Sequence, residues 1–430
     1  MRVLLSAYAC EPGKGSEQGV GWHWATELAL LGHEVDVITR SNNRSIIEAA
    51  MAHDPIAGLH FHYYDLASWA KWWKRGPRGV HLYYSLWQRG AYRLAKRLIE
   101  EMKFDLVHHL TFGVFRQPSF MGRLGLPFVV GPLGGGDATP PLLRRGIGKS
   151  NAFQELLRDV SNHLAFWNPS IAAMLRQATL ILCKTPETLA ILPAIYHEKC
   201  RVRLEIGLEP ERILQEPAGT AGSADFLFAG RLYYVKGLHL ALKAFSAVKI
   251  DQPAATFALI GAGPGEASYK KLSATLGIQD SVRWLGKVSH EEIWSHYRRY
   301  TAFLFPSLRD SSGNVLLEAM SQALPVICLD TGGPGALVSP SCGIKVPVEN
   351  RSEEDVVRDL AAAMQLLASS PEIRAQMSGR ALEFAKASSW KQVVSSAYGD
   401  IANAMHDAQG GLRAEAVRSQ RFAPEKTSLN

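Results

Sequence analysis

Apolar, strand-like runs alternate with helical patterns along the whole 430-residue chain. Runs of this kind stand in the first half at residues 2–9, 34–40, 59–66, 105–112, 127–136 and 179–185, and in the second half at 225–230, 256–263, 282–288, 302–307 and 324–330. Strands that alternate with helices are typical of parallel sheets covered by helices. Because one hydrophobic core rarely serves more than about 300 residues, the repeated pattern predicts an α/β protein with two domains.

The stretch between the two halves marks a domain boundary. Residues 201–224 gain glycine and proline and lose the hydrophobic period of their neighbours, as expected of a connecting segment. We place the boundary at Gly207, so that residues 1–206 form a first Rossmann-like domain and 207–390 a second. A helix at 391–406 follows, and the charged, poorly patterned residues 407–430 are predicted to be disordered.

Composition indicates a protein of the cytoplasm. The five cysteines are scattered without metal-type spacing, which favours buried thiols in a reducing compartment over a disulfide frame. The apolar run at residues 1–9 is too short for a signal peptide, and the sequence has no apolar run of 18 residues that could span a membrane. Residues 60–160 hold 15 Lys and Arg against 7 Asp and Glu, so the positive field belongs to the first domain.

Residues 305–323 combine an apolar strand, a polar turn and a helix, and they carry Asp310 and Glu318 eight residues apart. Such a turn directs backbone N–H groups and the positive end of a helix at a ligand, which suits an anion. The two carboxylates can hold hydroxyl groups around that anion. On this segment alone the alternative is a helix cap at Asp310 and a solvated helix face at Glu318.

A second motif at residues 226–245 has an apolar strand that ends at Gly230, followed by Arg231 and Lys236 just before an amphipathic helix. The Arg231 guanidinium is suited to two phosphate oxygens at once, and the Lys236 ammonium acts as a compact point charge. The alternative is an ordinary basic pair on a surface turn. Fixed cations of this kind stabilise the negative charge that grows on a departing nucleoside diphosphate.

Together the two motifs resemble the family-4 retaining glycosyltransferases, which have the two-domain GT-B fold. The pattern GRL…KG…AF is matched by Gly230, Arg231, Leu232, Lys236, Gly237, Ala244 and Phe245, and the E-x7-E signature by Pro306, Ser307, Asp310, Gly313, Leu317, Glu318, Ala319, Met320, Pro325, Val326 and Ile327. The resemblance implies two doubly wound Rossmann-like domains whose parallel sheets face each other across a cleft. It covers most of residues 1–400.

The resemblance also implies roles for individual residues. Glu318 would bind the ribose hydroxyls of the donor, and Asp310 would hold hydroxyls of the transferred sugar. Further donor contacts would come from Gly230, Gly286, Lys287, Val288, Ser311, Ser312, Gly313, Asn314 and Val315, and a glycine loop with Gly15, Gly19 and Gly21 would approach the diphosphate or the acceptor. This chain has Asp310 where the family usually has Glu, and Ser311-Ser312 in place of Gly-Phe. These differences leave open which donor sugar the protein binds.

Two other elements have open interpretations. His108, at the end of a predicted strand, takes the place of a histidine at the edge of the family's cleft, but a histidine there is equally typical of a satisfied core group. Residues 261–266 resemble a dinucleotide fingerprint, yet Glu266 stands where its third glycine belongs, which argues against NAD.

No D-x-D pair and no His/Asp cluster with metal spacing occurs in the sequence. We therefore predict metal-independent transfer without a cofactor.

The acceptor is indicated only by residues 68–98, which mix aromatic and basic side chains. Such mixtures favour the headgroup region of anionic membranes and hence a lipid-linked acceptor at the inner face of the cytoplasmic membrane. The alternative is that these aromatic residues pack in the core or line a sugar groove: Trp69, Trp72, Trp73, Tyr83, Tyr84 and Trp87. Nucleic-acid binding is disfavoured because no recognised module accompanies the charge.

The sequence thus predicts a glycosyltransferase that moves a sugar from a nucleotide-diphosphate sugar to a glycan or lipid-linked acceptor, with retention of configuration. Cell-envelope or extracellular polysaccharide synthesis is the expected setting. Two alternatives remain: a GT-B nucleotide-sugar epimerase or phosphorylase, and a non-catalytic sugar-binding partner subunit.

Overall fold

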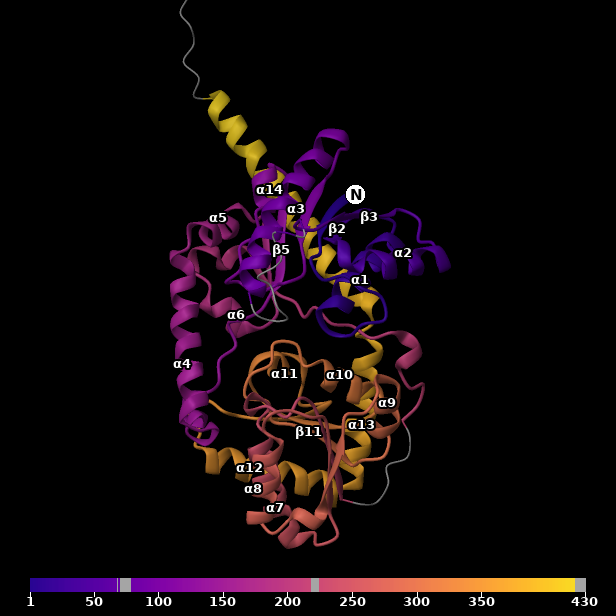
Figure 1. Ribbon diagram of the computed structural model, residues 1–430, viewed down its shortest axis with the longest axis vertical. Helices are drawn as coiled ribbons and strands as arrows, with labels where there is room; N and C mark the ends of the chain where they lie inside the picture. Colours follow the sequence, from indigo (N-terminus) through magenta and orange to yellow (C-terminus); the bar gives the residue numbers. More distant parts are fainter. Residues whose placement is uncertain (68, 70–78, 218–223, 422–430) are drawn as a thin grey trace, which may run out of the picture.

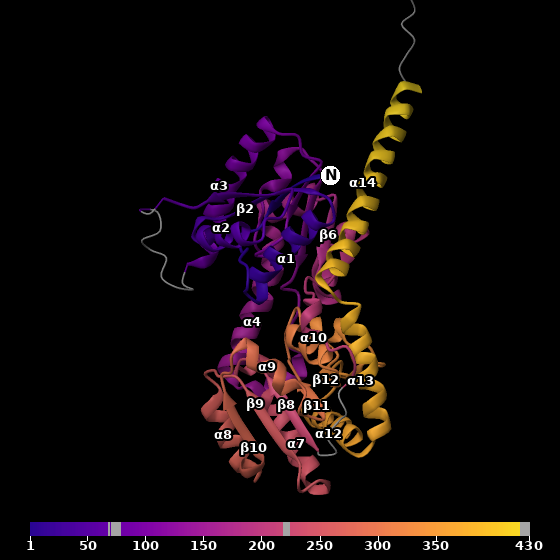
Figure 2. The ribbon, with the colours of Figure 1, turned by 90° about the vertical axis from the view of Figure 1, so that its right-hand side faces the viewer.

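The computed structural model describes residues 1–67, 69, 79–217 and 224–421, and Figures 1 and 2 show two domains, one above the other. Each domain is built on one parallel sheet, as the sequence predicts. The first sheet has seven strands in the order β3-β2-β1-β4-β5-β6-β7, and the second has six in the order β10-β9-β8-β11-β12-β13. The fold is α/β with the GT-B architecture.

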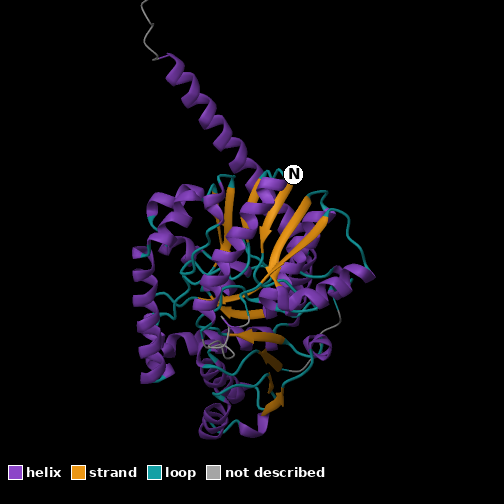
Figure 3. Cartoon of the chain, turned by 45° about the horizontal axis from the view of Figure 1, so that its top comes forward, coloured by secondary structure: helices purple, strands orange, loops and turns teal. Residues whose placement is uncertain are grey.

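The first sheet lies between two layers of helices (Figure 3). Neighbouring residues of β1 point to opposite faces, because side chains alternate along a strand: Leu4 packs toward α3 and α5, and Val3 and Leu5 pack toward α1 and α14. The strands of this sheet are β1 (Arg2–Ser6), β2 (Glu34–Arg40), β3 (Leu59–Tyr64), β4 (Leu106–His109), β5 (Phe128–Leu133), β6 (Leu180–Cys183) and β7 (Cys200–Val202). Its helices are α1 (Ser16–Leu30), α2 (Arg44–His53), α3 (Val80–Glu101), α4 (Lys149–Leu164), α5 (Pro169–Gln177) and α6 (Pro186–Ile191).

The second sheet is the centre of a single large core. Its strands are β8 (Asp225–Ala229), β9 (Thr256–Ile260), β10 (Val282–Gly286), β11 (Ala302–Phe305), β12 (Val326–Leu329) and β13 (Gly343–Val346). Its helices are α7 (Leu238–Asp251), α8 (Glu266–Thr275), α9 (His290–Tyr297), α10 (Asn314–Ser321), α11 (Gly332–Leu337), α12 (Glu353–Ser369) and α13 (Pro371–Lys386), and α14 (Trp390–Arg421) follows. Short 3-10 helices connect these elements: η1 (Ser41–Asn43), η3 (Met121–Leu124), η4 (Pro141–Ile147), η5 (Ala165–Trp167), η6 (Ala194–Lys199), η7 (Pro210–Arg212), η8 (Tyr234–Lys236) and η9 (Gln279–Ser281).

The central strands are mostly buried and were all expected from the sequence, whereas β7 and β13 were not. Both of these strands are the last in their sheets. An edge strand has one neighbour and part of its surface reaches water, so it tolerates charged residues. Arg201 in β7 and Lys345 in β13 interrupt the apolar run that would have identified each strand.

The chain crosses between the domains at two adjacent places. The Leu208 N–H donates to the Ser388 carbonyl at 3.0 Å, and the Trp390 N–H donates to the Leu208 carbonyl at 3.2 Å. A Cβ atom on Gly207 would lie 2.6 Å from the Trp390 nitrogen, so the two crossings fit together only with glycine here.

Helix α14 runs back along the first domain (Figure 2). Val394, Ala397 and Ile401 join the core beneath α1. The helix also continues through Asp407 to Arg421, where the sequence analysis expected a disordered tail from residue 407 onward. Alanine, glutamine and arginine are frequent in this stretch, and their high helix propensity supports continuation of the preceding helix. Residues 422–430 lie outside the described residues.

Part of the first half of the chain packs against the second domain. Leu143 and Ile147 of η4 belong to the core of the second sheet. Figure 1 shows α4 extending from this point along the edge of both domains. Residues 141–164 therefore connect the two domains even though they precede the boundary that we placed at Gly207.

Candidate functional site

Lys236 and Asp310 form an ion pair at the edge of the second sheet. β8 and β11 are hydrogen-bonded neighbours and run parallel, so the loops at their carboxyl ends meet. Lys236 ends η8 after β8, and Asp310 lies in the turn after β11. The Lys236 ammonium donates to the Asp310 Oδ2 atom and also lies 5.0 Å from the centre of the Phe305 ring. The structure thus brings together one residue from each sequence motif.

The second oxygen of Asp310 fixes the start of α10. Its Oδ1 atom accepts hydrogen bonds from the backbone nitrogens of Ser312 at 3.0 Å and Gly313 at 2.9 Å. Burial raises the pKa of this carboxyl, but the Lys236 ammonium and the two backbone amides outweigh burial, so the net pKa is lowered. Asp310 is therefore ionised in this structure and its charge is compensated by Lys236.

Glu318 shares a cavity with the N-terminal glycine loop. The cavity has a volume of about 220 Å³ and lies between the domains; its lining includes Gly15, Gly19, Asn314, Glu318 and Trp390. The hydroxyl of Tyr297 in α9 donates to Glu318 Oε2 at 3.0 Å, which orients the carboxylate. This arrangement places a carboxylate from the second domain opposite backbone amides of the first.

Gly21, the third predicted glycine of that loop, packs against the segment after β1. A Cβ atom on Gly21 would lie 2.0 Å from the Ala9 carbonyl oxygen. Gly21 therefore allows α1 to approach the segment after β1, and it is not among the residues that line the 220 Å³ cavity. Helix α1 begins at Ser16, within this loop.

Arg231 and the predicted donor contacts at residues 286–288 lie at the same edge of the second sheet. Arg231 is exposed, and its guanidinium carbon is 5.9 Å from the centre of the Tyr233 ring. Gly286 ends β10, and its carbonyl accepts from the Gly261 N–H at 2.7 Å. Lys287 is exposed and Val288 is half-buried beside the core. The loops after β8, β9 and β10 are thus joined, with their polar groups directed outward.

Ser311 and Ser312 face the first domain. The Ser312 hydroxyl donates to Glu205 Oε1 at 3.0 Å, and the Lys184 ammonium contacts the same oxygen at 2.6 Å. A Cβ atom on Gly134 would lie 3.4 Å from the Ser311 Cβ atom. Ser312 therefore forms a hydrogen bond between the two domains, and Ser311 lies close to Gly134 of the first domain.

Lys184 and Glu205 were not identified from the sequence. Burial lowers the pKa of the Lys184 ammonium, but the charges of Glu205 and Glu17 outweigh it and leave the pKa raised. Burial raises the pKa of the Glu17 carboxyl, whose Oε1 accepts from the Gly113 N–H at 3.2 Å. A lysine directly after the buried strand β6 was the one sequence signal for this cluster, because charged residues at strand ends often face a site.

His108 lies in the core of the first domain. Its Nε2 atom donates to the Gly131 carbonyl at 2.8 Å, so its Nδ1 atom accepts from the Tyr398 hydroxyl at 3.1 Å. Burial lowers the pKa of His108 to about 4. Both ring nitrogens are used within the protein, which favours the interpretation of His108 as a satisfied core histidine.

The glycine pair after β12 contacts the Asp310 turn. The Gly333 N–H donates to the Asp310 carbonyl at 2.7 Å, and the Gly332 N–H donates to Glu187 Oε1 at 2.7 Å. A Cβ atom on Gly333 would lie 2.5 Å from the Ser312 nitrogen. This run therefore supports the turn and joins it to α6 of the first domain.

Comparison with known proteins agrees with this arrangement. Residues 211–384 match the family described as "Glycosyl transferases group 1". We call residues 211–384, which carry this similarity, the group 1 domain. Arg231, Lys236, Asp310 and Glu318 all lie within the group 1 domain.

Two relatives of known name align with only part of this chain. The gpi3 subunit of phosphatidylinositol N-acetylglucosaminyltransferase from Schizosaccharomyces pombe is 33% identical over 121 residues, which are 27% of this chain and 26% of that protein. A D-inositol 3-phosphate glycosyltransferase from Streptomyces bingchenggensis is 26% identical over 238 residues, or 51% of this chain and 49% of that protein. The alignments thus span half or less of these relatives.

Solved structures with the same fold match nearly the whole chain. Sucrose-phosphate synthase from Thermosynechococcus elongatus has a TM-score of 0.62 at 17% identity and covers 95% of this chain and 99% of its own. WaaG, a glycosyltransferase involved in lipopolysaccharide biosynthesis, has a TM-score of 0.56 at 16% identity and covers 92% and 98%. Anabaena HepE in complex with UDP and glucose has a TM-score of 0.52 at 16% identity and covers 96% and 99%.

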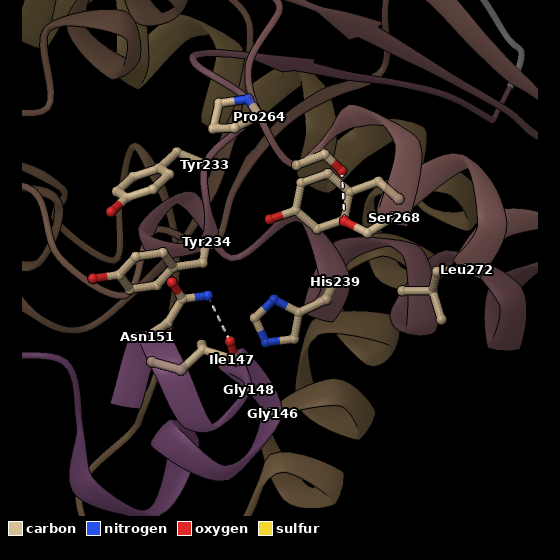
Figure 4. Close-up of a pocket in the computed structure, with 12 residues that line it drawn as sticks. Gly146, Ile147, Gly148, Asn151, Tyr233, Tyr234, His239, Pro264, Ser268 and Leu272 are labelled. Atoms are coloured by element: carbon tan, nitrogen blue, oxygen red, sulfur yellow. Dashed lines mark hydrogen bonds between the residues drawn. The ribbon is translucent and has the colours of Figure 1, made fainter. Parts of the chain in front are cut away.

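A second cavity of about 500 Å³ lies between the group 1 domain and η4 (Figure 4). Tyr233 and Tyr234 line it from the loop that carries Arg231 and Lys236, and Asn151 lines it from α4. His239 is buried there, its Nε2 atom has no hydrogen-bond partner, and burial lowers its pKa to about 4. The cavity is a further place where the first half of the chain completes a surface of the group 1 domain.

The described part of the chain has neither a metal-binding cluster of side chains nor a helix that could span a membrane. No group of three or more His, Cys, Asp or Glu side chains in residues 1–67, 69, 79–217 and 224–421 is arranged to hold a metal ion. No helix in the same part of the chain is long and apolar enough to cross a membrane.

Proposed function

We propose that the protein is a retaining glycosyltransferase that transfers a sugar from a nucleotide-diphosphate sugar to a glycan or lipid-linked acceptor. The observation that carries this proposal is the cavity that Glu318 shares with the Gly15–Gly19 loop. Glu318 stands eight residues after Asp310, the partner of Lys236. A carboxylate suits the two vicinal hydroxyls of a ribose, and glycine amides suit a diphosphate.

In this proposal charge is supplied by side chains and not by a metal. Arg231 and Lys236 bind the diphosphate and stabilise the charge that develops as the glycosidic bond breaks. The leaving phosphate accepts the proton of the attacking hydroxyl on the same face of the sugar, which retains the configuration. When donor binds, Lys236 exchanges part of its contact with Asp310 for phosphate, and Asp310 then accepts from sugar hydroxyls.

A panel of nucleotides and nucleotide sugars tests this proposal by thermal shift, because a ligand that binds only the native state raises its stability. UDP-glucose is the first probe, since HepE of Anabaena has been solved with UDP and glucose. We expect at least one nucleotide-diphosphate sugar to raise Tm more than its free nucleotide does. The absence of a shift with every donor would contradict the proposal.

Two alternatives have distinct outcomes in the same assay series. An epimerase or phosphorylase would interconvert or cleave the donor without an acceptor alcohol, and a sugar-binding partner subunit would bind donor without turnover. The proposal also places the protein in cell-envelope or extracellular polysaccharide synthesis, at the inner face of the cytoplasmic membrane. An acceptor screen with lipid-linked glycans tests this part of it.

A further inference from the structure

Helix α4 presents an apolar face to solvent. Five large side chains at helical spacing form this face and are exposed by about half: Phe153 by 60%, Leu156 by 52%, Leu157 by 53%, Val160 by 48% and Leu164 by 56%. The spacing of three or four residues places them on one stripe. Trp167, which follows in η5, is exposed by 85%. We call these six residues the α4 face. An exposed apolar area of this extent marks an interaction surface.

The opposite side of α4 is polar and is fixed to the protein. Glu155 is buried and accepts from the Tyr234 hydroxyl at 2.7 Å and from Arg309 at 2.9 Å. Arg158 and Asn162 donate to the Gly135 carbonyl at 2.7 and 3.2 Å. A helix that is polar inside and apolar outside cannot bury its stripe by turning over, because these hydrogen bonds would be lost. The α4 face is therefore held outward.

The charges around the α4 face favour one kind of partner. Among the charged residues of η4 and α4, the exposed ones are Arg145 and Lys149, which are both basic. Glu155 is buried, and Asp159 is half-buried and pairs with Arg144 at 2.7 Å. An apolar stripe with basic residues beside it and a tryptophan at its end matches the interface of an anionic bilayer.

We infer that the α4 face docks the protein on an anionic lipid surface, with the helix lying in the plane of the interface. A second copy of the chain is the less suitable occupant, because η4 and α4 offer no exposed carboxylate to pair with Arg145 and Lys149. This surface is distinct from residues 68–98, for which the sequence predicts membrane contact and in which Trp69 is exposed by 81%. Of that segment, Tyr83, Tyr84 and Trp87 are buried in the core, and Trp72 and Trp73 lie outside the described residues.

Docking at this face would hold the cleft near the lipid. Arg309 bonds Glu155 of α4 and directly precedes Asp310 in the chain. The bond from Arg309 to Glu155 thus links α4 directly to the turn that carries Asp310. This consequence rests on the proposed function, because it concerns delivery of a lipid-linked acceptor, whereas docking itself does not depend on transfer.

Sedimentation of the full chain with vesicles tests the inference. We expect binding to vesicles that contain phosphatidylglycerol and much weaker binding to phosphatidylcholine alone. Combined Leu156→Gln, Leu157→Gln and Val160→Gln should lower binding at least about tenfold, because the apolar area that enters the lipid is removed. Combined Arg145→Gln and Lys149→Gln should also lower it about tenfold. Ile250→Gln, which alters an exposed apolar side chain of α7, should leave binding unchanged.

Other outcomes overturn the inference. Equal vesicle binding by the triple variant, or no binding by the native chain, would show that the α4 face does not contact lipid. A native dimer that the triple variant converts to a monomer in analytical ultracentrifugation would assign the face to a second copy. Thermal unfolding curves check that each variant is folded. The donor-induced thermal shift is measured in parallel, so that failure of the proposed function and failure of docking are separate results.

Discussion

The Lys236 ammonium donates to the Asp310 carboxylate, and these two residues lie 74 positions apart in the chain. Each side chain is about one-fifth exposed, so the pair is shielded from solvent but open to a ligand. Both residues belong to the donor motifs predicted from the sequence, and in the pair their opposite charges compensate each other. This arrangement keeps the cation in position without leaving it unpaired.

The roles of the two partners separate on substitution. We expect Lys236→Met to lower kcat/KM at least about 100-fold, because a cation at the diphosphate is lost in the transition state. Asp310→Asn should lower kcat by a similar factor while the affinity for free nucleoside diphosphate is retained. Steady-state kinetics and nucleotide titrations measure both effects. Equal loss of nucleotide affinity in the two variants would argue against a sugar contact at Asp310.

Glu318 should be essential for donor binding. Glu318→Ala removes the carboxylate from the cavity that it shares with the glycine loop, and we expect kcat/KM to fall at least about 100-fold with an unchanged circular dichroism spectrum. Tyr297→Phe is the matched control, since it removes only the 3.0 Å hydrogen bond to Glu318. Its effect should be about tenfold or less. Normal transfer by Glu318→Ala would contradict the proposal that Glu318 binds the ribose hydroxyls of the donor.

Glu155 should stabilise the contact between the domains. Glu155→Leu leaves Arg309, Tyr234 and the Thr139 hydroxyl without their acceptor, and breaking a buried ion pair costs about 3 kcal/mol. We expect the free energy of unfolding in urea to fall by that amount. Gln154→Ala, at the exposed neighbouring position, should change it by less than about 0.5 kcal/mol. A small effect of Glu155→Leu would mean that the domains hold together without this carboxylate.

Gly237 should be required for the position of Lys236. Its φ is +65°, and a Cβ atom would lie 1.9 Å from the Pro306 carbonyl oxygen. Gly277 has a similar φ of +70° but no atom within 4 Å of such a Cβ. We therefore expect Gly277→Ala to cost about 1 kcal/mol of stability from backbone strain alone, and Gly237→Ala to cost at least about 3 kcal/mol. Equal costs in thermal unfolding would show that the loop after β8 moves freely away from Pro306.

His108 should make stability depend on acidity. The pKa of His108 is about 4 in the folded protein against 6.5 for the ordinary group, so between these values the unfolded chain binds the additional proton. The free energy of unfolding therefore rises with pH from 4 to 6.5 and falls on acidification, by about 1.4 kcal/mol per pH unit for this group. Urea denaturation across this range measures the slope.

Two variants separate the imidazole from its hydrogen bond. His108→Gln should remove the contribution of this group to the slope. Tyr398→Phe removes the donor to Nδ1 but keeps the buried ring, so it should lower stability by about 1 kcal/mol and leave the slope in place. An unchanged slope in His108→Gln would assign the acid sensitivity to other groups, of which the buried neighbour His109 is the first candidate.

The central strands were predictable because their residues either alternate between apolar and polar or form a continuous apolar run. Both patterns follow from the local geometry of a strand. The turns after β8 and β11 were expected from their strand-to-helix patterns, but only the order of strands in the sheet, in which β8 and β11 are neighbours, brings Lys236 and Asp310 together. The edge strands β7 and β13 were missed because they have only three and four residues and a basic residue interrupts the apolar run of each. The aromatic residues Tyr83, Tyr84 and Trp87 were ambiguous, since composition does not show which way a side chain points.

By itself, the sequence determined the two parallel α/β domains and the residues of the donor motifs, because both depend on patterns within about 20 consecutive residues. Only the tertiary structure decided what crosses between the domains. The bond from Ser312 to Glu205, the bond from Arg309 to Glu155 and the outward apolar face of α4 each join segments more than 100 residues apart or depend on which side of a helix is occupied. Their energies are set by burial and by partners that no local pattern encodes.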